Sequence, residues 1–162
     1  MDNILITTLD LLTKKNIPLG KIVLQKIVYF LKDRGVPFSY SFRPFTYGPY
    51  SSSLSHALES LCFWDYLEER GNEYSIRDLP TPAPDEDLTP RITAAIDTFA
   101  SMVDGQYDFK TMEIFGTVIS CRRALEEVGE EVTPDSVLAE FKAWKADKYD
   151  DDRILAAYRK IC

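Results

Sequence analysis

The chain has 162 residues, of which 45% are hydrophobic and 28% charged, and its formal net charge is −7. This length and composition are typical of one globular domain, or of one domain with an appendage. No apolar run approaches the ~20 residues that span a bilayer, and the N-terminus lacks the basic flank of a signal peptide, so we expect a cytoplasmic protein without membrane contact. Three widely spaced cysteines exclude a disulfide framework and a zinc site.

The charge is unevenly distributed along the chain. Residues 14–50 carry seven basic side chains against one acid, Asp33, whereas residues 79–162 carry 10 basic and 17 acidic side chains. Such asymmetry indicates either an interaction surface or solvated faces that happen to differ, and we favour the second interpretation.

The first half alternates between helical and extended patterns. The elements expected there are, in chain order, a helix over 3–15 capped by Asp2 or Asn3, a helix over 18–34 with Pro18 in its first turn and Gly35 after its end, a strand over 38–47 disturbed at Pro44, a helix over 51–62, and a β-hairpin over 63–69 and 73–76. This order resembles a winged helix-turn-helix in which residues 63–77 form the wing.

The second half is predicted to be helical. Residues 79–90 contain four prolines and three consecutive acids, which is typical of an extended linker. Helices are then expected from Thr89 and Pro90 to about residue 103, over 108–128, after Thr133 and Pro134, and after residues 150–152. We therefore predict a mainly α (α+β) fold with a winged-helix-like core over 1–78, a linker over 79–90 and a helical extension over 91–162 packed on the core.

Residue patterns for catalysis are sparse. His56 is the one histidine, so a metal site of the His-Glu-x-x-His type is impossible, and neither a Gly-x-Ser-x-Gly motif nor a phosphate-binding glycine loop occurs. The acidic clusters at 85–87 and 150–152 are better explained as solvated linker and helix cap than as a metal site. We expect no enzyme, no cofactor and no bound metal.

Residues 42–54, which read FRPFTYGPYSSSL, pose the main question of the sequence. We expect a rigid corner made by Tyr47, Gly48, Pro49 and Ser51, in which Gly48 and Pro49 stop the strand and turn the chain. Phe42, Phe45 and Tyr47 are expected in the core. The candidates for contact with a partner are Gln25, Lys26, Tyr40, Arg43 and Tyr50.

Nucleic-acid binding is possible on this pattern but not favoured. A winged helix often reads DNA through one helix and needs lysines and arginines there. The expected third helix, over 51–62, carries none, and the expected wing mixes Arg70 and Arg77 with three glutamates.

Two motifs resemble those of a known family. Residues 24–31 read LQKIVYFL, and residues 47–51, about fifteen positions later, read YGPYS. Together they resemble the Panacea (SocA-like) domain and the related YwgA-type bacterial proteins, with a match over roughly residues 5–77. The resemblance implies a non-enzymatic, antitoxin-like module in a phage, mobile-element or toxin–antitoxin context, which acts by binding a protein partner such as a toxin.

Overall fold

The computed structural model describes residues 2–162, and these residues form seven helices and two separate two-stranded antiparallel sheets. The elements are α1 (Asn3–Lys14), α2 (Lys21–Asp33), β1 (Arg43–Phe45), β2 (Gly48–Tyr50), α3 (Ser52–Phe63), β3 (Leu67–Arg70), β4 (Glu73–Ile76), α4 (Leu88–Met102), α5 (Phe109–Glu127), α6 (Pro134–Lys145) and α7 (Asp151–Ile161). The predicted fold class, mainly α with a small antiparallel component, is confirmed.

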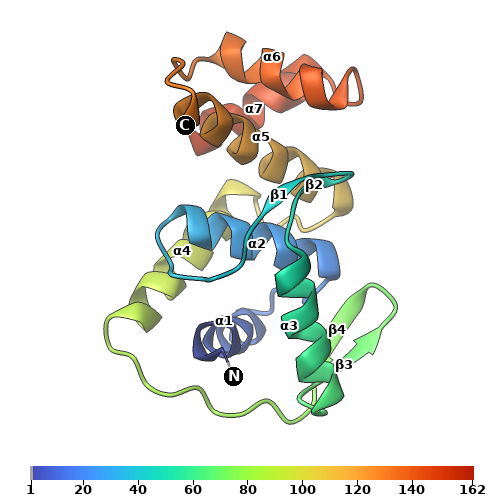
Figure 1. Cartoon of the computed structure of the whole chain (residues 1–162), viewed down its shortest axis with the longest axis vertical. Helices are drawn as coiled ribbons and strands as arrows, with labels where there is room; N and C mark the ends of the chain where they lie inside the picture. The colour runs from blue at the N-terminus through green and yellow to red at the C-terminus, as the bar shows by residue number, and fades with distance from the viewer. Residues whose placement is uncertain (1) are drawn as a thin grey trace.

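Helix α2 lies at the middle of the molecule and joins its two ends. Figure 1 shows α1, α3 and the β3–β4 hairpin at one end, and α5, α6 and α7 at the other. All residues from 23 to 31 are buried, because α2 packs against α4, α5 and β2. A helix that is buried on all sides along its middle turns is expected at such a central place.

Several helix ends are fixed by local chemistry, as the sequence predicts. The Asp2 carboxylate accepts hydrogen bonds from the backbone N–H groups of Ile4 and Leu5 at 2.9 and 3.2 Å, which caps α1. Ser51 caps α3 through Leu54 N–H, and Thr133 forms a reciprocal capping box with Ser136 at the start of α6. Each cap satisfies backbone donors that a helix leaves free.

The start of α2 differs from the prediction. Pro18 does not lie in its first turn, since the helix begins at Lys21. Backbone bonds with the second hairpin hold the preceding residues extended: Lys21 N–H donates to Asn72 O at 2.8 Å, and Tyr74 N–H donates to Leu19 O at 2.9 Å. This long-range pairing overrides the local preference for helix and ties the first interhelical connection to β4.

The predicted strand over 38–47 is wrong in its extent and in its turn. Only Arg43–Phe45 is a strand, and it pairs with Gly48–Tyr50 in a tight hairpin with Phe45 opposite Gly48. The chain therefore reverses at Thr46 and Tyr47, while Gly48 and Pro49 lie within β2 rather than ending a strand. Gly48 has a φ of +105°, a conformation that side-chain-bearing residues rarely adopt.

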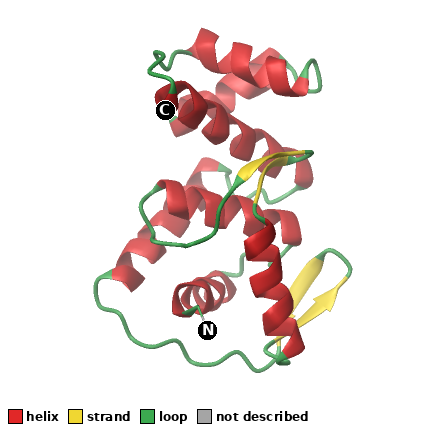
Figure 2. Ribbon diagram, in the orientation of Figure 1, coloured by secondary structure: helices red, strands yellow, loops and turns green. Residues whose placement is uncertain are grey.

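The second hairpin forms as predicted, but its first strand begins later than expected, at Leu67, because α3 continues to Phe63. Strands β3 and β4 pair with Leu67 opposite Ile76 and Arg70 opposite Glu73. Figure 2 shows the loop that follows running along one end of the molecule before α4 begins. Helix α4 starts at Leu88, slightly earlier than expected, because the Asp85 carboxylate accepts bonds from Asp87 and Leu88 N–H at 3.0 and 2.8 Å.

Candidate partner-binding groove

The two sequence motifs bind each other. The Gln25 amide pairs with the backbone of Ser51: its Nε2 donates to Ser51 O at 2.9 Å, and its Oε1 accepts from Ser51 N–H at 2.8 Å. Both residues are buried, at 4% and 1% exposure. This buried two-bond pair fixes the junction of β2 and α3 against α2.

Lys26 makes the neighbouring contact. Its Nζ donates to Pro49 O at 2.9 Å, and the residue is 3% exposed. The side chain runs in a slot between two glycines: a Cβ added at Gly116 would lie 2.9 Å from Lys26 Cδ, and one at Gly48 would lie 3.4 Å from Lys26 Nζ. The close approach of α2, β2 and α5 therefore requires glycine at Gly116 and favours it at Gly48.

A buried carboxylate anchors the same region from the other end of the molecule. Glu113 on α5 is fully buried and forms ion pairs with Lys148 at 2.8 Å and Lys145 at 3.0 Å, and Tyr149 O–H donates to it at 2.5 Å. Lys145 Nζ also donates to Thr46 O at the hairpin tip, at 2.6 Å. The network thus connects α5 and the α6–α7 loop to the β1–β2 turn.

These buried charges have shifted pKa values. Burial raises the pKa of Glu113, but the hydrogen bonds from Lys148, Tyr149 and Lys145 outweigh it, so the pKa lies below its usual value. Burial and the positive charge of Lys145 lower the pKa of Lys26 to about 8, although Glu113 partly opposes the shift. Lys26 is therefore the less favourably placed of the two charges.

The hairpin displays aromatic side chains to solvent. Phe45 is 53% exposed and stacks on Tyr50, and Tyr47 is 50% exposed and meets the ring of Phe109 edge-on at 4.9 Å. The Lys148 ammonium lies 5.6 Å from the ring centroids of both Tyr47 and Phe109.

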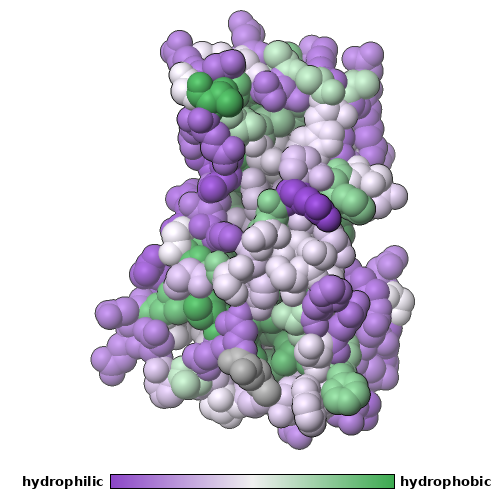
Figure 3. All heavy atoms as spheres, viewed as in Figure 1, coloured by the Kyte–Doolittle hydropathy of each residue, from purple (hydrophilic) through white to green (hydrophobic). Residues whose placement is uncertain are grey.

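These aromatic residues border a groove of about 730 Å³, which we call the aromatic groove. Its floor comes from α2, one wall from the β1–β2 hairpin and Phe109, and the other wall from α3 and the β3–β4 hairpin. Figure 3 shows the surface hollowed between the two hairpins. The lining residues are Lys21, Ile22, Gln25, Lys26, Phe45, Tyr47, Gly48, Tyr50, Ser55, Leu58, Glu59, Glu69, Asn72, Tyr74 and Phe109.

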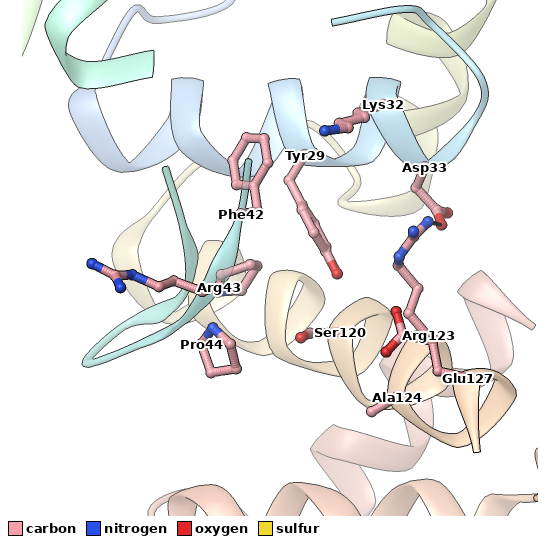
Figure 4. Close-up of a pocket in the computed structure, with 11 residues that line it drawn as sticks. Tyr29, Lys32, Asp33, Phe42, Arg43, Pro44, Ser120, Arg123, Ala124 and Glu127 are labelled. Atoms are coloured by element: carbon pink, nitrogen blue, oxygen red, sulfur yellow. Dashed lines mark hydrogen bonds and ion pairs between the residues drawn. The ribbon is translucent and has the colours of Figure 1, made fainter. Parts of the chain in front are cut away.

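A second, smaller cavity of about 240 Å³ lies on the other side of the β1–β2 hairpin. Figure 4 shows Tyr29 reaching from α2 toward Ser120 of α5, while the Arg43 guanidinium points away from them. Arg123 pairs with Asp33 at 2.8 Å across one end of this cavity. This cavity is smaller and is not lined by the exposed aromatic rings, so the aromatic groove is the stronger candidate site.

The structure corrects several expectations about which residues face solvent. Gln25 and Lys26 are buried because α5 and β2 cover their face of α2. Tyr40 is buried too, and its hydroxyl donates to the Asp2 carboxylate at 2.6 Å. We expected these three residues on the outer surface, and that expectation is wrong.

Conversely, Phe45 and Tyr47 are exposed rather than in the core, and Phe42 is half-buried against Tyr29. Arg43 is exposed, as expected of a contact residue, and Tyr50 is half-buried with its hydroxyl bonded to Ser55 at 2.8 Å. Sequence reasoning missed Phe109, Lys145 and Glu113, since no local pattern signals that they reach the hairpin.

The basic stretch over residues 14–50 is largely engaged. Its lysines bind as follows: Lys14 pairs with Asp10, Lys15 with Asp97 and Lys21 with Glu69, whereas Lys26 donates to Pro49 O and Lys32 to Tyr40 O. Arg34 and Arg43 remain exposed. The stretch therefore offers few free cations to a polyanion.

His56 is exposed on α3, apart from these networks. Within residues 2–162, no three histidine, cysteine, aspartate or glutamate side chains gather in a way that would hold a metal ion. In the same residues, no helix has the length and apolar character needed to cross a membrane.

Comparison of the chain with protein-family models gave no match, and comparison with curated proteins gave none either. The resemblance to the Panacea domain therefore rests on the two motifs, LQK and YGPYS, which the structure brings into contact through Gln25, Lys26, Pro49 and Ser51.

Proposed function

We propose that this chain is a non-enzymatic, antitoxin-like protein-binding module that holds a segment of a partner protein in the aromatic groove and so neutralises or regulates that partner. The observation that carries the proposal is the aromatic wall of the groove. Phe45 in β1, Tyr47 in the turn after it and Phe109 at the start of α5 are 53%, 50% and 42% exposed. Exposed aromatic side chains beside a pocket are typical anchors of protein interfaces.

The rigidity of the hairpin adds support. Lys26, Lys145 and the Gln25 amide hold its backbone at Pro49, Thr46 and the junction with Ser51. A surface that is already ordered loses little conformational freedom when a partner binds, which favours affinity. The backbone that carries Phe45 and Tyr47 is therefore held in place before any partner binds.

The test is to co-express the chain with the products of neighbouring genes, then to measure growth rescue and complex formation by co-purification. We expect rescue and a stable complex with one such product, and loss of both in a Tyr47→Ala, Phe109→Ala double variant. Phe63→Ala is the matched control, because Phe63 is 76% exposed and lies outside the groove. The proposal is wrong if no neighbouring gene product gives rescue and a complex. It is also wrong if Phe63→Ala loses rescue and complex formation as much as the double variant does.

DNA binding is a second candidate, supported by the order of α1, α2 and α3 before the β3–β4 hairpin and by the pairing of Gly20 with Glu73 of that hairpin. A gel-shift titration across salt distinguishes it. Binding that weakens steeply with salt would favour a regulator, and absent binding at ~50 mM salt would remove this candidate.

A further inference from the structure

Lys26 is a buried cation whose surroundings supply little negative charge. Of its three N–H donors, one goes to Pro49 O, a neutral acceptor. The nearby acid, Glu113, is already engaged by Lys145, Lys148 and Tyr149. Buried charges are normally paired, so a nearly buried ammonium without a carboxylate partner is an unusual feature.

Its position connects this feature to the aromatic groove. Lys26 lines the groove together with its neighbour Gln25, with Gly48 and with the exposed rings of Phe45 and Tyr47. Gly48 packs directly against the ammonium, since an added Cβ would lie 3.4 Å from Lys26 Nζ, so no side chain of β2 stands between them at this position. Thr117 Oγ1, a fully buried hydroxyl oxygen without a hydrogen-bond partner among residues 2–162, lies beside the same glycine, because a Cβ added at Gly48 would be 3.3 Å from it.

From this charge complementarity we infer that the aromatic groove accepts a peptide carboxylate, carried by an aspartate or glutamate flanked by apolar residues, and that the carboxylate pairs with Lys26. The inference rests on the proposed protein-binding function and names the chemistry of the bound segment. Apolar neighbours of the acid fit the rings of Phe45, Tyr47 and Phe109, which line or border the approach to Lys26.

The rest of the groove selects against a polyanion. Its remaining charges are Glu59 and the ion pair of Lys21 with Glu69. A nucleic acid carries a negative charge on each nucleotide and gains affinity from several cations at once. One buried cation beside two glutamates suits a single carboxylate in an apolar setting instead.

The experiment uses the full chain and a phage-displayed library of random short peptides. An enriched peptide and its Glu→Gln (or Asp→Asn) counterpart are synthesised with a fluorescent label, and their affinities are measured by polarisation. They are measured against the wild type, Lys26→Met and Lys14→Met. Lys14 is the matched control, because it is an exposed lysine on α1 outside the groove.

We expect enriched peptides to share an acid beside apolar residues, and loss of its charge to weaken binding to the wild type by about tenfold or more. The same Glu→Gln or Asp→Asn exchange in the peptide should hardly change its affinity for Lys26→Met. For Lys14→Met it should weaken binding as much as for the wild type. Because the exchange on the peptide leaves the protein intact, the inference remains testable even where Lys26→Met folds poorly.

Other results separate the two levels of the proposal. One result would overturn the pairing with Lys26 but leave the protein-binding function standing. In it, peptides bind the wild type and bind Tyr47→Ala more weakly, yet they need no acid, or loss of their acid weakens binding to Lys26→Met as much as to the wild type. A library that yields no groove-binding peptide overturns both. Displacement of a bound peptide by oligothymidylate shows a site for nucleic acid and likewise overturns the inference.

Discussion

At the scale of single residues, Gln25 has the clearest structural role. Its amide satisfies a buried N–H and a buried C=O of Ser51 at once. In Gln25→Leu both groups would lose their partner inside the protein, so we expect the free energy of unfolding to fall by about 2–4 kcal/mol in urea denaturation. Gln106→Leu, at an exposed loop glutamine, should change it by less than about 0.5 kcal/mol. If both substitutions lowered the free energy of unfolding equally, the hydrogen bonds between Gln25 and Ser51 would not contribute to stability as expected.

Lys26 has the opposite effect on stability, because its charge is buried. Burial, together with the positive charge of Lys145, lowers its pKa from the ordinary 10.5 of an exposed lysine to about 8 in the folded chain. Between these values the unfolded chain binds more protons, so this residue makes the unfolding free energy rise with pH. The cost of the buried charge, about 3 kcal/mol, is fully present below pH 8 and is relieved by pH 10.5.

The corresponding prediction concerns the difference between wild type and Lys26→Met. Measured by urea denaturation, the stability of the wild type relative to the variant should rise from pH 8 to 10.5, since the variant lacks the titrating group. Lys14→Met controls for the loss of an ordinary exposed lysine. A difference that stays constant over this pH range would contradict the buried-charge assignment.

At the scale of elements, Glu113 holds the β1–β2 hairpin through α5 and α6. Its removal leaves Lys145, whose side chain is only 6% exposed, without a carboxylate partner. Breaking one side of a buried ion pair costs about 3–5 kcal/mol, so we expect Glu113→Gln to lower the free energy of unfolding by this amount at neutral pH. Glu130→Gln, at an exposed glutamate, should have little effect.

The effect of Glu113 also has a defined pH dependence. Because the folded-state pKa lies below the ordinary value of 4.5, its contribution is present above pH 4.5 and is lost as the pH falls through the folded-state pKa. The gap between wild type and Glu113→Gln should therefore narrow in acid. A gap that widens there would mean that the carboxylate is destabilising in the folded state.

Elements whose ends depend on local chemistry were predictable from sequence, and those held by distant residues were not. Asp2, Ser51 and Thr133 cap their helices through bonds within a few residues, and such patterns are readable. The start of α2 and the turn of the first hairpin instead depend on Asn72 and Lys145, which lie far along the chain. No local pattern encodes those contacts.

At the scale of the molecule, the same reason explains which part of the candidate site was missed. The polar face of α2 that carries Gln25 and Lys26 looks solvent-exposed when the helix is considered alone, but Gly116 of α5 packs onto it. The β1–β2 hairpin that covers this face carries Phe45 and Tyr47, which are exposed to solvent. Sequence therefore identified the two motifs as important, whereas their internal contact and the resulting aromatic surface needed the three-dimensional packing.

That packing predicts that the winged-helix-like part does not fold by itself. Helix α2 has fully buried side chains at Leu24, Ile27 and Val28, and the helices that cover it include α4 and α5, which follow the linker. A chain ending at Asp87 would expose a large apolar face of α2, which a unit of this size cannot easily tolerate. We expect it to show no cooperative thermal transition by circular dichroism, whereas the whole chain unfolds in one. Adding a separate chain of residues 88–162 should restore the transition by re-covering α2. A cooperative transition in the shorter chain alone would instead establish residues 2–87 as an independent domain and the helices beyond them as an appendage.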